Sequence, residues 1–203
     1  MISIIDYDAG NIKSVEKAFD YFGCNVTVTR NPKEILASDK VILPGVGSFG
    51  DAMSQLDKYD LISPIKDFAA TGKPFLGICL GLQLLFEESE ESPGVAGLSL
   101  LKGKIIRFPE KEGFKIPQIG WNSLDLKNNG RLFKGIENGS FVYFVHSYYL
   151  KADDPGIVTA TSQYAATVDA SVESSNIFAC QFHPEKSSNV GLAMIRNFID
   201  LQV

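Results

Sequence analysis

The sequence predicts a three-layer α/β fold with a mainly parallel central sheet and an antiparallel extension. In the first half of the chain, short apolar and β-branched runs alternate with helical patterns, which is the order of βαβ units. In the second half, from residue 104 onward, strand-like runs follow one another and are separated by turn residues. The 203 residues, of which 45% are hydrophobic, suit one core, so we expect a single domain over residues 1–203.

The first half contains four expected strands, at residues 2–6, 26–29, 40–43 and 75–78. Their unbroken apolar runs are typical of parallel strands that are covered on both faces. Helices are expected over residues 11–22 and 60–71. The second helix has a clear C-terminal signal, because Gly72 and then Pro74 follow it.

The second half contains expected strands at residues 141–146, 157–161 and 177–182, with turn sequences at residues 128–130, 138–139 and 153–156. An amphipathic helix near residues 191–201 closes the chain. Between the two halves, the loop at residues 87–97 carries the run Glu-Glu-Ser-Glu-Glu, which we interpret as a solvated face.

Charge and hydropathy exclude several classes of function. The chain has 19 basic and 24 acidic residues and a net charge of −5, which leaves no broad cationic surface for nucleic acid or anionic membranes. The longest apolar run, residues 74–86, is shorter than the roughly 20 residues of a membrane span. The first ten residues lack the basic start and the cleavage site of a secretory signal, so we expect a cytoplasmic protein.

Three cysteines, Cys24, Cys79 and Cys180, are spaced too widely for a disulfide framework or a zinc site, so we expect no metal. Residues 77–81 read Gly-Ile-Cys-Leu-Gly, the G-x-nucleophile-x-G pattern, directly after the strand at 75–78. Such glycines permit a tight turn, and the N–H groups of a following helix favour a thiolate. The alternative is that Cys79 is a small buried hydrophobic residue, so the pattern needs a partner base.

A candidate base follows the last strand, where residues 181–186 read Gln-Phe-His-Pro-Glu-Lys. Pro184 disfavours a helical conformation for His183, so we expect an extended segment in which side chains two residues apart point the same way. Glu185 would then orient the imidazole and stabilise its charged form. An isolated His-Pro-Glu sequence is more often a surface turn, but ligands in such sheets bind beyond the carboxyl ends of strands, where Cys79 also lies.

His146 is the rival base, within the strand at residues 141–146. It shares one face with Val142, Phe144 and Tyr148, and no carboxylate follows to orient it. We therefore interpret it as a packed histidine that lines a wall. Cys24 and Cys180 lack the flanking pattern of glycines and are assigned to the core.

Residues 45–50 read Gly-Val-Gly-Ser-Phe-Gly, a literal GxGxxG motif after the strand at 40–43. A dinucleotide site would also need an acidic residue about 20 positions further at a strand end, and the nearest one, Asp67, falls in a helical pattern. We favour a strand-end loop whose backbone N–H groups, together with the N–H of Leu80, form an oxyanion hole.

Together these motifs make the chain resemble the class I (triad) glutamine amidotransferases over its full length. Motifs typical of the glutaminase subunits that serve histidine biosynthesis lie at residues 10–11, 44–50, 84–90, 120–122, 144–148 and 183–187. The resemblance implies a flavodoxin-like fold and hydrolysis of the side-chain amide of glutamine. It implies neither a metal nor another cofactor.

The resemblance also implies roles for particular residues. For catalysis these are Cys79, His183 and Glu185. For the oxyanion hole they are Gly45, Val46, Gly47 and Leu80, and for glutamine binding Gln83, Ser147 and Tyr148.

The family passes its ammonia to a second protein, and the resemblance implies a heterodimer with a (β/α)8-barrel synthase subunit. An enclosed path suits the chemistry, because ammonia is mostly protonated in neutral water and ammonium is no nucleophile. The residues expected to face the partner are Asn11, Trp121, Tyr143 and Lys186. The glycine-rich loop at residues 45–50 is expected to have two states, with little glutaminase activity until the partner docks.

One departure from the family pattern is Asp8-Ala9, where relatives usually carry a glycine and another small residue. It leaves the expected catalytic residues untouched and concerns the expected partner interface. Three alternatives stay open: the same chemistry serving a surface-sugar amidotransferase, a free-standing cysteine hydrolase, and a non-catalytic binding module with this fold.

Overall fold

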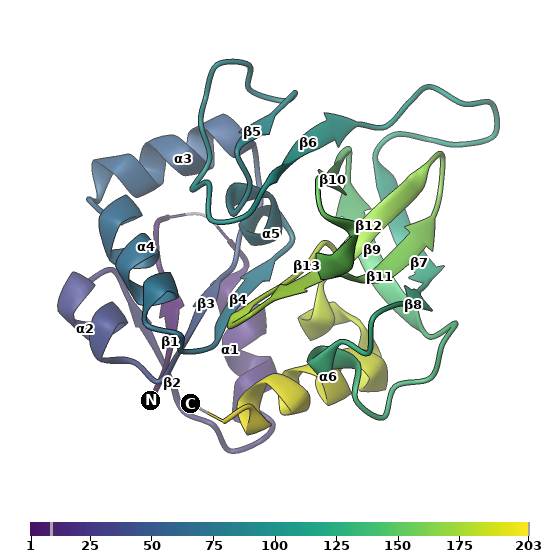
Figure 1. The fold of residues 1–203 in the computed structure, drawn as a ribbon. Coiled ribbons are helices and arrows are strands. Elements are labelled where there is room, and N and C mark those ends of the chain that lie inside the picture. The colour runs from purple at the N-terminus through teal and green to yellow at the C-terminus, as the bar shows by residue number, and fades with distance from the viewer. Residues whose placement is uncertain (9, 203) are drawn as a thin grey trace.

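The apolar runs of the first half form the parallel part of the central sheet. In the computed structural model, which describes residues 1–8 and 10–202, this sheet has eight strands in the order β2-β1-β3-β4-β13-β12-β11-β8 (Figure 1). The parallel strands are β2 (Val26–Thr29), β1 (Ile2–Ile5), β3 (Lys40–Leu43), β4 (Phe75–Ile78) and β13 (Ile177–Cys180). The antiparallel ones are β12 (Thr167–Ser174), β11 (Val158–Gln163) and β8 (Asp125–Leu126). The expected mainly parallel sheet with an antiparallel extension is confirmed.

Helices cover both faces of this sheet and make the three layers. Residues of α1 (Ile12–Asp20) and α6 (Ser188–Asp200) contribute to the core on one face. The core on the other face includes residues of α2 (Pro32–Ala37), α3 (Phe49–Lys58), α4 (Ile62–Ala70) and α5 (Leu80–Leu84). Figure 1 shows α1 and α6 side by side, away from α2, α3 and α4.

Two smaller sheets flank the site that is described below. One joins β10 (Tyr148–Ala152), β6 (Gly103–Arg107) and β5 (Glu88–Ser89). The other is a ribbon of β7 (Gln118–Ser123) and β9 (Phe141–His146). Short 3-10 turns lie at η1 (Arg131–Phe133), η2 (Pro155–Ile157) and η3 (Pro184–Lys186).

Two helices were not expected from the sequence. In α2, Pro32 occupies the first turn and the Asn31 side chain caps it. In α3, the hydroxyl of Ser48 accepts a hydrogen bond from the N–H of Asp51, which starts a helix inside the glycine-rich segment. The closing helix also begins three residues earlier than expected, at Ser188.

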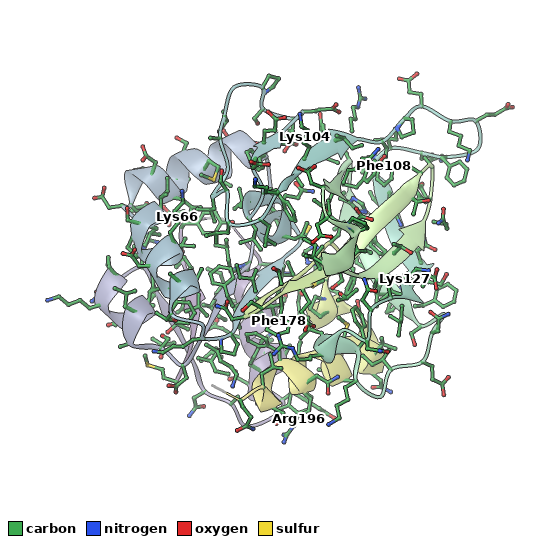
Figure 2. The ribbon with its side chains drawn as sticks, viewed as in Figure 1. Lys66, Lys104, Phe108, Lys127, Phe178 and Arg196 are labelled. Carbon is green, nitrogen blue, oxygen red and sulfur yellow. The ribbon has the colours of Figure 1, made fainter. Side chains whose placement is uncertain are left out.

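The chemistry of the side chains agrees with these layers. Lys66, Lys104, Lys127 and Arg196, which Figure 2 labels, are exposed, whereas Phe178 of β13 is buried and packs against Phe198 of α6. Within the described part of the chain, no helix is both long and apolar enough to cross a membrane. The same residues contain no cluster of side chains suited to hold a metal ion.

Candidate active site

The carboxyl ends of β3, β4 and β13 meet at one edge of the central sheet and open into a cavity of about 440 Å³. The walls come from these strand ends, from α5 and from the β9–β10 connection. The lining residues are Val46, Gly47, Cys79, Leu80, Gln83, Glu91, Pro117, Val145, His146, Ser147, Tyr148, His183 and Lys186. Cys79 and His183, which the sequence places at this edge, thus line the same cavity.

Cys79 lies on a sharp turn between β4 and α5. Its φ of 54° is in the left-handed region, and its N–H donates to the carbonyl of Cys180 over 2.8 Å. Both flanking glycines are required by close packing. A Cβ on Gly81 would lie 1.8 Å from the Leu43 carbonyl oxygen, and one on Gly77 would lie 2.8 Å from the carbonyl oxygen of Gly81. The turn thus has the strained geometry expected of a nucleophile.

The helix after Cys79 has five residues, so its contribution comes from individual N–H groups rather than from the dipole of a long helix. The N–H groups of Leu82 and Gln83 bond to the carbonyl of Cys79. Among the described residues, none accepts a hydrogen bond from the N–H of Leu80. That N–H borders the cavity and is available to a ligand.

His183 and Glu185 form a buried pair beside this turn. The distance from Nδ1 of His183 to Oε1 of Glu185 is 2.7 Å, and the two side chains are 2% and 1% exposed. His183 is extended, as predicted from Pro184, but residues 184–186 form a 3-10 turn, so the expected extended segment is wrong beyond His183. Proline restricts the residue before it while its own φ suits a helical turn, and the turn brings the carboxylate back to the imidazole.

The surroundings of His183 decide its charge. Burial lowers the pKa of His183, but the neighbouring Cys79 sulfur and the Glu185 carboxylate outweigh burial and raise that pKa to about 10. Within the described chain, Nε2 of His183 is buried without a hydrogen-bond partner, so the effect of Cys79 is one of proximity in the shared cavity. Both neighbours therefore favour the protonated form of the imidazole.

His146 is a wall residue, as expected. Its Nδ1 lies 2.8 Å from the carbonyl oxygen of Tyr148, and its ring packs against Phe108, which Figure 2 labels, and Phe144. Burial lowers the pKa of His146 to about 4, so it stays neutral near pH 7. No carboxylate is among its hydrogen-bond partners in the described residues.

The glycine-rich loop reaches the cavity through Val46 and Gly47, and Gly47 has a φ of +101°. Gly45 lies behind this wall, where a Cβ would come within 2.5 Å of the Tyr7 hydroxyl and 2.9 Å of the Leu80 Cβ. The Tyr7 hydroxyl donates to the carbonyl of Pro44 over 2.8 Å and anchors the loop from below. The three cavity-lining residues assigned to the oxyanion hole are thus close to Cys79, and the fourth supports them.

The three residues assigned to glutamine binding, Gln83, Ser147 and Tyr148, all line the cavity. Glu91, the acidic residue among the lining side chains, is not expected from the sequence, because the surrounding acidic run is typical of a solvated face. Its Oε2 accepts a hydrogen bond from the N–H of Phe49 at the start of α3. No pattern in the sequence separates it from the other glutamates of that run.

Of the other residues expected to face the partner, Trp121 and Tyr143 lie on the β7–β9 ribbon, and Lys186 follows the His183 turn. The rings of Trp121 and Tyr143 meet edge to face with centroids 6.0 Å apart, and the Tyr143 carbonyl accepts from the N–H of His183. Lys186 is exposed and lines the cavity mouth. Tyr143 and Lys186 are therefore directly connected to the His183 turn, and Trp121 is connected to it through Tyr143.

Asn11 lies on the other side of the loop. It directly precedes α1, and a Cβ on its neighbour Gly10 would lie 3.6 Å from the Pro44 side chain. Asp8 accepts hydrogen bonds from Arg30 and Tyr59. Ala9, part of the departure from the family pattern, lies outside the described residues.

The remaining cysteines differ from each other. Cys180 is fully buried, as expected, and burial raises its pKa well above the ordinary value. Cys24 is partly exposed, so the expectation of a core position is wrong for this residue. It packs only along the edge of the α1 side of the core, because it lies in the turn between α1 and β2.

The doubly wound sheet and the cysteine turn define a class of protein, and the comparison with protein families gives it a name. Residues 3–201 match the model of the family described as glutamine amidotransferase class-I, and the chain belongs to this family. Among curated relatives, the protein of Bacillus mycoides is 52% identical over 98% of this chain and 93% of its own length, and that of Syntrophotalea carbinolica 46% identical over 99% and 100%. Both carry the name imidazole glycerol phosphate synthase subunit HisH.

Solved structures show the same fold at lower identity. A crystal structure of a glutamine amidotransferase superposes with a TM-score of 0.76 at 16% identity, over 98% of this chain and 97% of the other. The fold and family inferred from the sequence motifs are thus confirmed.

Proposed function

We propose that this chain is the glutaminase subunit of an imidazole glycerol phosphate synthase, which hydrolyses glutamine and passes the ammonia to a synthase partner. The observation that carries the chemistry is the meeting of Cys79, on its strained turn, with the buried His183–Glu185 pair in one cavity. The assignment to this synthase rests on relatives of about half-identical sequence that match over nearly their full length.

In the first half of the reaction, Cys79 attacks the side-chain carboxamide of glutamine. A protonated imidazole beside the sulfur favours the thiolate, which is the nucleophile. Attack gives a tetrahedral oxyanion, and the backbone N–H groups of Val46, Gly47 and Leu80 are the donors that stabilise it. His183 then gives its proton to the leaving nitrogen, so that ammonia departs and a γ-glutamyl thioester remains on Cys79.

In the second half, the neutral imidazole of His183 takes a proton from water as the water attacks the thioester. The carbon–sulfur bond breaks, glutamate forms, and the thiolate–imidazolium pair is restored. Glu185 holds the ring in place throughout, because its carboxylate lies 2.7 Å from Nδ1 and leaves Nε2 toward the cavity.

The cavity offers complementary groups for the rest of the glutamine molecule. The volume of about 440 Å³ is within the usual range for a small-molecule site. Glu91 supplies a carboxylate for the α-ammonium group of the substrate, and the Ser147–Tyr148 segment and Gln83 supply polar groups for its carboxamide and carboxylate. We add Glu91 to the predicted binding residues on this basis.

The partner's docking surface is the outward face of the β7–β9 ribbon. Ile119, Trp121 and Phe141 on this ribbon are 63%, 53% and 57% exposed, an unusual concentration of large apolar side chains at a surface. The ribbon continues into the cavity at Val145. A (β/α)8-barrel synthase docked here, with Asn11, Tyr143 and Lys186 at the rim, would enclose the cavity mouth and keep ammonia from protonation in bulk water.

The alternative functions fare less well. The curated relatives support neither a surface-sugar amidotransferase nor a free-standing cysteine hydrolase. A binding module without catalysis would have no use for the positive φ of Cys79 or for a buried imidazolium. The cytoplasmic location and the single domain over residues 1–203 stay predictions.

The test is the synthase reaction with a barrel subunit, supplied with either glutamine or ammonium salt. Cys79→Ser is expected to abolish synthesis from glutamine and to leave synthesis from ammonia intact. Cys24→Ser is the matched control, because this cysteine lies outside the cavity, and it should retain both activities. Loss of both activities in Cys79→Ser, or glutamate release that persists in it, would contradict the proposal.

A further inference from the structure

A row of polar groups inside the protein ends at the sulfur of Cys79. The side chain of Gln181 is fully buried between β13 and the His183 turn, and its Nε2 donates to Sγ of Cys79 over 3.7 Å. Its Oε1 accepts from Nε2 of Gln83 at 3.0 Å. The same Nε2 of Gln83 also donates to the carbonyl oxygen of Tyr148 at 3.0 Å.

The order of donors and acceptors in this row is fixed at one end. The Tyr148 carbonyl can only accept a hydrogen bond, so the amide of Gln83 must turn its NH2 group toward it. That NH2 group then donates its second proton to Gln181, so Oε1 of Gln181 must be the acceptor. The opposite end of the Gln181 amide is an NH2 group, and it points to Cys79. Backbone geometry at Tyr148 therefore decides that the sulfur receives a donor.

We propose that Gln181 is a positioning residue of the glutaminase reaction: it holds an N–H donor against the Cys79 sulfur, in a direction set through Gln83 by the Tyr148 carbonyl. This inference rests on the proposed function, since it concerns the same nucleophile. The donor matters most when the sulfur is a thiolate, because hydrogen bonds to charged groups are stronger than those between neutral groups. The Val145 carbonyl oxygen, 4.0 Å from the sulfur, has the opposite preference, because it can only accept the thiol proton.

The same row prepares Gln83 for substrate. Both protons of its NH2 group are used inside the protein, and no hydrogen bond within the described residues uses its Oε1. Because Gln83 lines the cavity, this oxygen is left as an acceptor for an N–H group of glutamine. One relay of two amides thus sets the polarity of the binding site and of the nucleophile together.

Other groups around the sulfur also titrate or carry charge. His183 shares the cavity, the pKa values of Tyr7 and Cys180 are raised in part by Cys79, and Glu185 lies behind His183. None of these residues is itself altered when an amide of the relay is replaced. A change in the pH dependence of the thiol can then be assigned to the relay.

The experiment measures alkylation of Cys79 by iodoacetamide as a function of pH, with the labelled peptide quantified by mass spectrometry. Iodoacetamide needs no glutamine site and no turnover, so the result does not depend on the catalytic test above. The first variant is Gln181→Met, which keeps the length of the side chain but removes the donor. Its pH of half-maximal labelling is expected to rise by about one unit, with roughly tenfold slower labelling on the acid side.

The second variant is Gln83→Met, which does not touch the sulfur. It frees the Gln181 amide to turn over, and the relay predicts a smaller rise in the same direction. Gln118→Met is the matched control: Gln118 is a buried glutamine with no hydrogen bond to Cys79 in the described residues, and its replacement should leave the labelling profile unchanged.

A profile of Gln181→Met that equals that of the wild type overturns the role of the donor. A shift in Gln181→Met without one in Gln83→Met overturns the relay. If Gln181→Met does not fold, as judged by its thermal transition, the Gln83→Met profile alone decides, because a purely structural role for Gln181 predicts no shift there.

Discussion

Replacement of Glu185 by glutamine tests the buried pair that is central to the proposed chemistry. Nδ1 of His183 and Oε1 of Glu185 are 2.7 Å apart, and both side chains are almost fully buried. Glu185→Gln keeps the size of the side chain and one acceptor oxygen but removes the negative charge. Because burial alone lowers the pKa of His183, the variant loses one of the two partners that hold this pKa near 10.

The pair makes the stability of the protein depend on pH in a defined range. The folded-state pKa of His183, about 10, is above the ordinary value of 6.5, so the native state binds this proton more tightly than the unfolded state. The resulting stabilisation is complete below about pH 6.5 and is lost as the pH rises through 10. The whole shift corresponds to at most roughly 5 kcal/mol, at about 1.4 kcal/mol per pKa unit.

Glu185→Gln is expected to lower the free energy of unfolding at neutral pH by about 2–4 kcal/mol. Breaking a buried ion pair usually costs about 3–5 kcal/mol, and the expected loss is smaller here because the amide oxygen still accepts from the ring. Glu185→Gln should also flatten the decline between about pH 6.5 and 10, because the imidazole is then already neutral over much of that range. Urea unfolding of both proteins at several pH values measures these two effects.

The matched control is Glu88→Gln, which removes an exposed carboxylate that pairs with Lys104. It should change stability little and leave the pH dependence of the wild type. If the free energy of unfolding declines equally steeply with pH in the wild type and in Glu185→Gln, the reasoning is refuted, whatever the absolute stabilities. In assays of turnover, Glu185→Gln should retain more activity than His183→Ala. In the subtilisin triad, loss of the orienting residue leaves roughly 70-fold more activity than loss of the histidine.

Other predictions concern the cysteine turn and the loop beside it. A glutamine-mimicking alkylating agent is expected to label Cys79 and to spare Cys24 and Cys180; mass spectrometry of the digested protein would expose any other order of reactivity. Gly81→Ala places a Cβ 1.8 Å from the Leu43 carbonyl oxygen and should cost about 1–3 kcal/mol of stability and slow the labelling of Cys79, so an unchanged melting temperature would contradict the packing argument. Glutamate release should rise when a barrel subunit is added. Equal rates with and without that subunit would contradict the hypothesis that the loop at residues 45–50 has two states.

The parallel strands of the central sheet and the helices α1, α4 and α6 could be predicted from short stretches of sequence, whereas β5, β6, β7, β8, β10 and β12 were not expected. The run at β4 is apolar and β-branched because its neighbours cover both faces, and that pattern is visible without knowing the neighbours. The helix α3 was missed for a local reason of its own: glycines at 45, 47 and 50 indicated a loop, although Ser48 and Asp51 provide a helix cap. Here two local signals conflicted, and packing of Phe49 into the core decided between them.

The candidate site divides in the same way. Cys79 and His183 were found because glycines and a proline mark their turns in the sequence. Glu91 was hidden among exposed glutamates, and only the fold shows that it alone of that run lines the cavity. Gln181 was part of a recognised motif but had no assigned role, although a glutamine at the end of an otherwise apolar buried strand is itself a signal.

Local sequence was therefore sufficient for the class of fold and the family and for proposing a nucleophile and a base, because hydrophobic periodicity and turn chemistry act between residues a few positions apart. The folded chain was needed for the charge of His183, the place of Glu91 and the relay from Tyr148 to Cys79. Gln181 and Cys79 are 102 positions apart, and their contact exists only because β4 and β13 are adjacent strands. Strand order, burial and the direction of an amide arise from the whole chain, so no short segment carries them.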